Sequence, residues 1–318
     1  MRIASFNIES LDAGHKSRVP LADRIPVLRP VLQRLAADVL CLQEINAQKA
    51  RGHGPRSLLA LQGLIRETPY ELFNVASTSL SGGAFADVHN IVTLSRYPIV
   101  SQRQIHHDYI VPPELGGLPG HLEPAKFDRP LLATDLQLAD GHILTVINLH
   151  LRAPLATSVP GQKSTAFTWR SVEGWAQGFY ASALKQTAQA LEARLFIEDL
   201  LKVEKSRLIA VAGDFNCEDH APALRLIQGA EEDIGASELA AHALIVLDRC
   251  LPADRRWSVL HSGRPTMLDH ILVSHPLYGF FRGLEVYNEA LADEAVGFGK
   301  STHSAASYHA PIVAEFNI

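Results

Sequence analysis

Short apolar runs recur along the whole chain and predict a protein built on strands. Most of them are four to eight residues long, rich in Val, Ile and Leu, and bounded by turn residues. Runs of this length and composition are typical of buried strands. They cover residues 3–8, 39–42, 72–75, 91–94, 131–138, 143–149, 208–211, 268–273 and 312–316.

Three segments show helical periodicity instead. In residues 21–36 and 181–201, apolar side chains recur at intervals of three and four, which predicts amphipathic helices with one face packed on a core. Residues 222–228 predict a third, shorter helix. Helices are thus fewer than strands, and we expect them on the outside of the sheets.

The strands combine antiparallel pairing with burial on both faces. Asp140-Gly141 between two apolar runs is a strong hairpin signal. Residues 143–149 and 208–211 are apolar at both alternating sets of positions, as in strands that are covered on both sides. We therefore predict a four-layer α/β sandwich, in which two mixed sheets pack face to face and helices cover both outer faces.

The chain has 318 residues, which is near the upper limit for one hydrophobic core. Because no linker divides it, we predict a single domain over residues 1–318. Two stretches rich in Pro and Gly, near 106–130 and 152–180, interrupt the strand pattern. Irregular insertions of this length are uncommon unless they are functional.

Charge and composition exclude several classes of protein. The formal net charge of −5 argues against nonspecific coating of polyanions, although it leaves room for a local basic groove. Three cysteines without a CxxC pair argue against a disulfide framework and a cysteine zinc site. No signal-peptide pattern and no membrane-span pattern occur. We therefore expect a soluble, cytoplasmic protein with no evident obligate protein partner.

Polar side chains gather where the apolar strands begin or end. Asn148 and His150 lie two residues apart, as do Asp214 and Asn216, so each pair shares one face of a strand. Taken singly, such residues are usually turn formers or structural hydrogen-bonding groups. Together they place polar groups where burial favours apolar ones, and an unpaired buried carboxylate is costly. If the strand ends meet, a cation and a phosphate would satisfy these groups. The other strand ends carry Asn7, Glu44, Asp269 and His309.

The motifs at these strand ends resemble those of the endonuclease/exonuclease/phosphatase superfamily of metal-dependent phosphoesterases. Gly213-Asp214-Phe215-Asn216 after an apolar strand is fairly specific to that superfamily, and Leu42-Gln43-Glu44 is moderately so. All matching segments occur in the family's order, and they span nearly the whole chain. The resemblance implies a two-sheet α/β sandwich with one cleft. The segments are residues 5–7, 42–44, 148–150, 213–216, 268–272 and 307–311.

The resemblance and the chemistry of phosphodiester hydrolysis together suggest roles. Glu44, helped by Asn7, would hold Mg²⁺ or Mn²⁺, because oxygen ligands suit these ions. His309 would activate the attacking water, with Asp269 orienting its ring. Asp214 is the rival base.

The remaining candidates would contact the substrate. Asn216 and His150 would bind the phosphoryl oxygens, with Asn148 supporting them. Arg129, at the start of a strand, is either a phosphate ligand or one half of a surface ion pair.

The last motif departs from the family pattern. Tyr308 stands where the family usually has Asp, and that Asp contributes a carboxylate near the metal in some members. Its replacement puts a second metal position in doubt. We therefore expect one principal cation.

Three functions fit these observations. The leading interpretation is a metal-dependent nuclease, a class that is frequent in the family. The alternative is a phosphatase or phosphodiesterase of a small phosphorylated molecule or lipid head group, which the acidic net charge and the two insertions fit almost as well. A catalytically inactive binding module is the least favoured, because the candidate catalytic residues are present.

Overall fold

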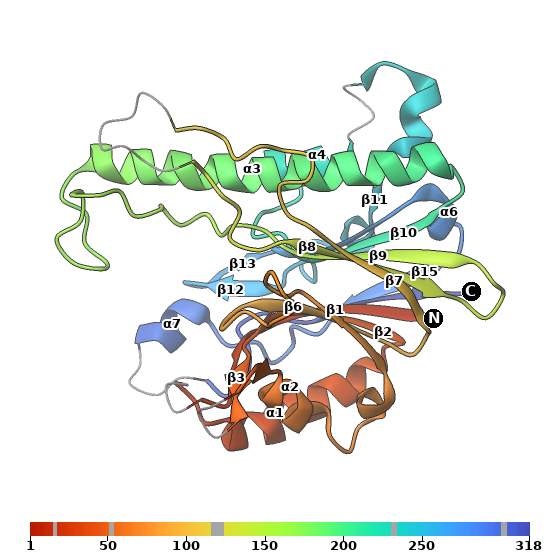
Figure 1. Cartoon of the computed structure of the whole chain (residues 1–318), viewed down its shortest axis with the longest axis horizontal. Coiled ribbons are helices and arrows are strands. Elements are labelled where there is room, and N and C mark those ends of the chain that lie inside the picture. The colour runs from red at the N-terminus through yellow and green to blue at the C-terminus, as the bar shows by residue number, and fades with distance from the viewer. Residues whose placement is uncertain (15–17, 51–53, 116–123, 230–233, 300–303) are drawn as a thin grey trace.

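The computed structural model describes residues 1–14, 18–50, 54–115, 124–229, 234–299 and 304–318. Two six-stranded sheets pack face to face, and helices cover both outer faces (Figure 1). This architecture confirms the predicted four-layer α/β sandwich. Residues 116–123 of the first predicted insertion lie outside the described residues.

The first sheet has the strand order β15-β16-β1-β2-β6-β5. It is mixed, because β1 pairs parallel with β2 and antiparallel with β16. Helices α1 (Leu21–Leu35) and α2 (Leu59–Ile65) pack on its outer face. Its strands are β1 (Arg2–Leu11), β2 (Val39–Ile45), β5 (Asn74–Ser77), β6 (Asn90–Ser95), β15 (Phe281–Val286) and β16 (Ile312–Phe316).

The second sheet has the order β11-β14-β10-β9-β8-β7. The predicted hairpin around Asp140-Gly141 joins β8 to β9, and β9 then pairs parallel with β10. Helices α3 (Val172–Val203) and α4 (Pro222–Gln228) cover the outer face. The strands are β7 (Ile99–Ile105), β8 (Leu131–Gln137), β9 (Ile143–His150), β10 (Leu208–Asp214), β11 (Ile245–Val246) and β14 (Asp269–Val273).

Short elements surround the sandwich. Two small hairpins are formed by β3 (Gln48–Lys49) with β4 (Arg56–Ser57) and by β12 (Val259–His261) with β13 (Arg264–Thr266). Helical turns occur at α6 (His275–Tyr278), α7 (Glu294–Gly299), Pro69–Leu72, Ser237–His242 and Leu247–Cys250. Among the described helices, none combines the length and the apolar character needed to cross a membrane.

Strand β10 shows how the sequence pattern builds the layers. Ile209 and Val211 point to the cluster beneath α3 and α4, whereas Ala210 and Ala212 point into the layer between the sheets. Every residue of β10 is buried. This double burial explains why both alternating sets of positions are apolar.

The observed elements differ from the predicted ones where local sequence is a poor guide. Helix α3 begins at Val172 rather than at residue 181, because Ser171 caps it by accepting a hydrogen bond from Gly174 N. Strand β7 was not predicted, since it is an edge strand with mostly exposed side chains. The predicted run 72–75 becomes the end of a helical turn followed by β5.

Candidate active site

Three neighbouring strands of the second sheet place a histidine and two aspartates in one row. Asp214 of β10 lies opposite His150 of β9 and opposite Asp269 of β14. His309, which precedes β16 in the other sheet, joins this row because its Nδ1 lies 2.8 Å from Asp269 Oδ2. Its Nε2 lies 3.9 Å from Asp214 Oδ2. One ring nitrogen of His309 is therefore bound to protein, and the other faces Asp214.

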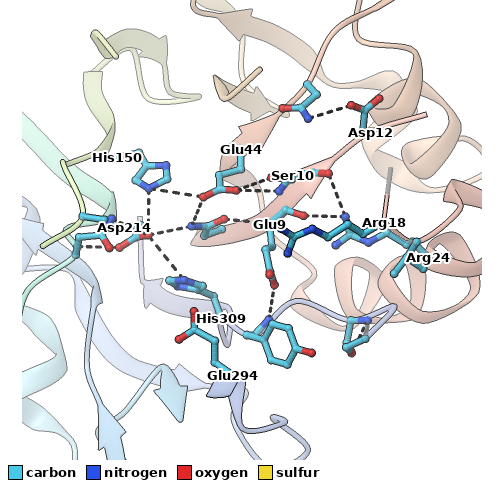
Figure 2. A pocket seen from close by; sticks show the side chains of 18 of the residues that line it. Glu9, Ser10, Asp12, Arg18, Arg24, Glu44, His150, Asp214, Glu294 and His309 are labelled. Atoms are coloured by element: carbon cyan, nitrogen blue, oxygen red, sulfur yellow. Dashed lines mark hydrogen bonds and ion pairs between the residues drawn. The ribbon is translucent and has the colours of Figure 1, made fainter. Parts of the chain in front are cut away.

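The first sheet supplies the facing wall. Asn7 of β1 donates from Nδ2 to Asp214 Oδ2 over 2.9 Å and to Glu44 Oε1 over 3.4 Å. His150 Nε2 lies 3.3 Å from Asp214 Oδ2 and 3.9 Å from Glu44 Oε1. Figure 2 shows Glu44, His150, Asp214 and His309 turned toward one another. The site thus lies where the ends of the two sheets meet.

The backbone around Glu44 is held in conformations that side chains rarely adopt. Glu9, Ser10 and Glu44 have φ angles of 57°, 48° and 62°, in the left-handed region that favours glycine. Ser10 N and Oγ both donate to Glu44 Oε2, at 2.9 and 3.1 Å. The buried guanidinium of Arg24 donates to the carbonyls of Ile8, Glu9 and Ser10. Strain of this kind persists where surrounding contacts enforce it, as at active sites.

These side chains surround one cavity of about 530 Å³. It extends from the row of polar residues toward α7, which contributes Glu294. The residues that line it are Asn7, Glu9, Ser10, Asp12, Arg18, Val19, Arg24, Glu44, Asn46, Arg129, His150, Ala153, Asp214, Asn216, Glu294, Ser304, Ala306, Tyr308 and His309.

Burial and charge shift the pKa values of the central pair in the same direction. Burial raises the pKa of Asp214 far above its ordinary value, more than His309 and the Asn7 amide lower it. Burial lowers the pKa of His309, but the carboxylates of Asp269 and Asp214 outweigh burial and raise it. Asp214 therefore takes up a proton more readily than an ordinary aspartate, and His309 keeps its proton at neutral pH.

The pKa values of His150 and Glu44, which lie beside this pair, are both lowered. Burial, followed by repulsion from Arg129, lowers the pKa of His150, so its ring is neutral. Burial raises the pKa of Glu44, but His89, Arg129 and His309 outweigh it and keep the carboxylate ionised. The cavity thus holds a fixed negative charge at Glu44 beside the positive charge of Arg129.

Most residues predicted from the sequence meet in this cavity. Glu44, Asn7, His150, Asp214, Asn216, Arg129 and His309 all line it. Asp269 is fully buried behind His309 and touches the cavity through that ring.

Asn148 is the exception among the predicted substrate-binding residues. It is fully buried and does not line the cavity. Its Oδ1 accepts from Gln43 Nε2 over 2.8 Å, and its Nδ2 donates to the Val92 carbonyl over 2.9 Å. Asn148 therefore links the two sheets, and we no longer expect it to contact the substrate directly. The i,i+2 pattern correctly placed it on the same strand face as His150, but two residues deeper in the sandwich.

Asn7 also has a different geometry from the expected metal ligand. Its Oδ1 accepts a hydrogen bond from Glu9 N over 3.0 Å, which turns its NH₂ group toward Glu44 and Asp214. An amide nitrogen does not hold Mg²⁺ or Mn²⁺. In this arrangement Asn7 orients the two carboxylates, and Glu44 is the better candidate for the metal.

Sequence reasoning missed two groups beside Glu44. His89, at a φ of 59°, places Nδ1 3.6 Å from Glu44 Oε2. Glu9 accepts a hydrogen bond from the backbone N–H of Tyr308 over 3.0 Å. The i,i+2 spacing of Asn7 and Glu9 was a usable signal for Glu9, whereas no local pattern marks His89.

The contact with Glu9 clarifies the unusual last motif. Tyr308 is buried, and its hydroxyl occupies the space next to Gly297, where a Cβ would lie 1.8 Å from it. Position 308 thus supplies no carboxylate, but Glu9 places one against its backbone. Burial raises the pKa of Glu9, although the Tyr308 N–H opposes the shift.

The donor set fits a divalent cation. Among the described residues, Glu44 Oε1 has only the long contacts to Asn7 and His150, and hard oxygen donors suit Mg²⁺ and Mn²⁺. Asp214, Asp269 and His309 form another possible group, with ligand atoms within 4.8 Å of one another.

The model of the Endonuclease/Exonuclease/phosphatase family matches residues 4–289. No curated protein matches the sequence.

Several solved structures share the fold. An endonuclease/exonuclease/phosphatase from Bacteroides vulgatus is 16% identical, with 99% of this chain and 98% of that chain covered and a TM-score of 0.59. Truncated TDP2 from Caenorhabditis elegans is 14% identical, with coverage of 99% and 96% and a TM-score of 0.57. A mannosyl-6-phosphatase from Bacteroides thetaiotaomicron is 14% identical, with coverage of 100% of both chains and a TM-score of 0.58.

Proposed function

Because the chain belongs to the endonuclease/exonuclease/phosphatase family, we propose that it is a divalent-metal-dependent phosphodiester hydrolase that acts on nucleic acid. The observation that supports this most is the meeting of Glu44, His150, Asp214 and His309 around one cavity. Phosphodiester hydrolysis needs an activated water, charge relief on the phosphoryl oxygens and a stabilised leaving oxygen. The four side chains can meet these needs together with one cation.

Glu44 would hold the cation, either Mg²⁺ or Mn²⁺. The alternative group contains His309 and Asp269, which already bind each other over 2.8 Å, so we assign His309 to proton transfer and Asp269 to holding its ring. When bound, the ion would relieve charge on the phosphoryl oxygens and on the leaving group. A single carboxylate centre favours one principal ion.

Asp214 is the better base for the attacking water. His309 lies between two carboxylates that raise its pKa, so it can give a proton but is slow to accept one. Asp214 has a raised pKa and is held by Asn7 Nδ2 and by the N–H of Asn216 over 2.8 Å. We therefore favour the rival assignment, with Asp214 as base and His309 as acid.

The phosphate would bind on the opposite side of this pair. His150 is neutral and presents Nε2 toward Asp214 and Glu44. Arg129 lines the cavity, and the carboxylates of Glu44 and Asp214 partly offset the lowering of its pKa by burial. Asn216 donates from Nδ2 to the Leu151 carbonyl over 3.0 Å, so part of its amide already binds the protein. The Arg129 guanidinium is therefore our principal candidate for binding the phosphoryl oxygens.

A small phosphorylated substrate is the second candidate. The cavity extends past the catalytic row to charged side chains, among them Asp12, Arg18 and Glu294. Such walls suit the polar body of a sugar or inositol phosphate. One structure with the same fold is a mannosyl-6-phosphatase.

Hydrolysis assays separate these functions. The protein would be incubated with Mg²⁺, Mn²⁺ or EDTA against plasmid DNA, single-stranded RNA, bis-p-nitrophenyl phosphate and a panel of inositol phosphates. We expect ion-dependent cleavage of the nucleic acids and of the small diester, with Tyr278→Ala as a control variant distant from the site. Cleavage of monoesters alone would favour the second candidate. No turnover of any substrate would instead favour an inactive binding module.

A further inference from the structure

The N-terminal half of α3 extends past the ends of the strands. Figure 1 shows this overhang on the side of the molecule where α7 lies, and α7 contributes Glu294 to the cavity. The loop from His150 to the start of α3 runs along the overhang, and it begins at the cavity wall with Ala153. We call residues 152–185 the arm.

The face of α3 that packs on the sheet continues onto the arm. Ala190, Ala193 and Ile197 belong to the core beneath the helix, and helical spacing places Gln186, Phe179 and Trp175 on the same face. Gln186 Nε2 donates to the carbonyls of Phe215 and Asn216, each over 3.2 Å. This face therefore points to the catalytic end of the sheet.

Two aromatic rings occupy this face where none of the described strands covers it. Trp175 and Phe179 stack with ring centroids 5.3 Å apart and an interplanar angle of 23°, and they remain 44% and 41% exposed. At a rise of about 1.5 Å per residue, they lie roughly 16 and 10 Å along the helix from Gln186. The distance from the Asn216 loop to the rings is therefore one that a short strand of a few nucleotides can span.

The arm is built to hold these rings in place. A Cβ on Gly178 would lie 2.2 Å from the Thr157 carbonyl oxygen, and one on Gly174 would lie 2.6 Å from Gln162 Cβ. The loop therefore packs directly on the helix backbone. Ordered aromatic side chains lose little conformational freedom when a ligand binds.

The charge of the arm is opposite to that of the chain. It carries four cations and one carboxylate, a net charge of +3, whereas the whole chain carries −5. Arg152 and Lys185 share Asp128. Within the described part of the chain, no ion pair joins Lys163 or Arg170 to a carboxylate. An anionic partner is therefore favoured over a neutral or basic one.

We propose that the arm is a stacking platform for single-stranded nucleic acid, with bases against Trp175 and Phe179 and the backbone near Lys163 and Arg170. The proposal rests on the phosphodiesterase function proposed above and names its substrate class. Exposed aromatic rings beside cations bind unpaired bases without requiring a particular sequence. A membrane surface is less favoured, because these two rings lie on the sheet-facing side of the helix.

Fluorescence anisotropy with labelled deoxythymidine oligonucleotides in EDTA tests the platform without turnover. We expect Trp175→Ala and Phe179→Ala each to weaken binding of a 12-mer about 5- to 100-fold, and Trp175→Phe to retain most of it. Tyr278→Ala is the matched control, because Tyr278 is also 44% exposed and stacks on Phe281. Affinity should also rise steeply between a dinucleotide and a 6-mer, since only the longer strand reaches the rings.

Several outcomes would overturn the proposal. Equal binding by the Trp175→Ala and Tyr278→Ala variants, with circular dichroism showing intact folds, would remove the rings from the site. Binding of phosphatidylserine vesicles through Trp175, without oligonucleotide binding, would assign the arm to membranes. Wild-type hydrolysis of bis-p-nitrophenyl phosphate separately tests the proposed function, so that its failure and the failure of the platform are distinguishable.

Discussion

At the scale of single residues, the site is defined by which polar group already has a partner. His309 Nδ1 and Asp269 Oδ2 bind each other, and Asn7 turns its NH₂ group to the carboxylates. These contacts leave His309 Nε2 and Asp214 as the pair that we propose to exchange protons with a substrate. Residue identity alone did not reveal this division of roles, because it depends on which atom of each side chain faces the cavity.

The proton-transfer pair gives a pH-dependent prediction. Asp214 must be ionised to accept a proton, so kcat/KM should fall as the pH decreases through its raised pKa. His309 must be protonated to give one, so the rate should also fall as the pH rises through its own raised pKa. Asp214→Asn and His309→Ala should each reduce kcat by about 10²–10⁴-fold.

The pH–rate profiles of the two variants provide the check. Residual activity of His309→Ala should lack the alkaline limb, and that of Asp214→Asn should lack the acid limb. The reverse pattern would restore His309 as the base.

At the scale of elements, the row of candidate catalytic residues depends on close contact between β9 and β10. Gly213 precedes Asp214, and a Cβ at this position would lie 1.9 Å from the Leu149 carbonyl oxygen. The glycine of the Gly-Asp-Phe-Asn motif is therefore required by strand packing rather than by chemistry. It lets the parallel strands approach so that Asp214 stands beside His150.

We expect Gly213→Ala to separate these strands. Forcing a methyl group against a backbone carbonyl should lower the free energy of unfolding by about 1–3 kcal/mol or more, as measured by urea denaturation. Gly283→Ala in β15 is the control, because nothing lies within 4 Å of its added Cβ. Equal free energies of unfolding for the two variants would show that the close β9–β10 contact does not require glycine at position 213.

At the scale of the whole molecule, the site joins two sheets built from distant parts of the chain. The order and type of the buried strands could be predicted, because each carries its own apolar run and its own polar end. The pairing of β14 with β10 could not, since register over such separations leaves no local pattern. For the same reason His89 was missed, and Asn148 was assigned to the cavity instead of the space between the sheets.

Metal binding provides a prediction at this scale. A ligand that binds only the folded protein stabilises it by about 2.7 kcal/mol at 100 times its Kd, so Mg²⁺ or Mn²⁺ should raise the Tm and EDTA should reverse the rise. Glu44→Gln should abolish most of this shift, whereas the exposed Glu315→Gln should retain it. Calorimetry that finds two tight ions per chain would contradict the expectation of one principal ion.

The packing between the two sheets sets the distance between Glu44 and Asp214 across the cavity. Close to the site the layer between the sheets is filled by small side chains, Cys41 on β2 and Ala212 on β10, beside the Gln43–Asn148 bridge. Close-packed interiors transmit changes in volume rather than absorbing them. These positions therefore act as spacers that set the distance between Glu44 and Asp214. A bulkier side chain at either position would increase that distance without contacting the substrate.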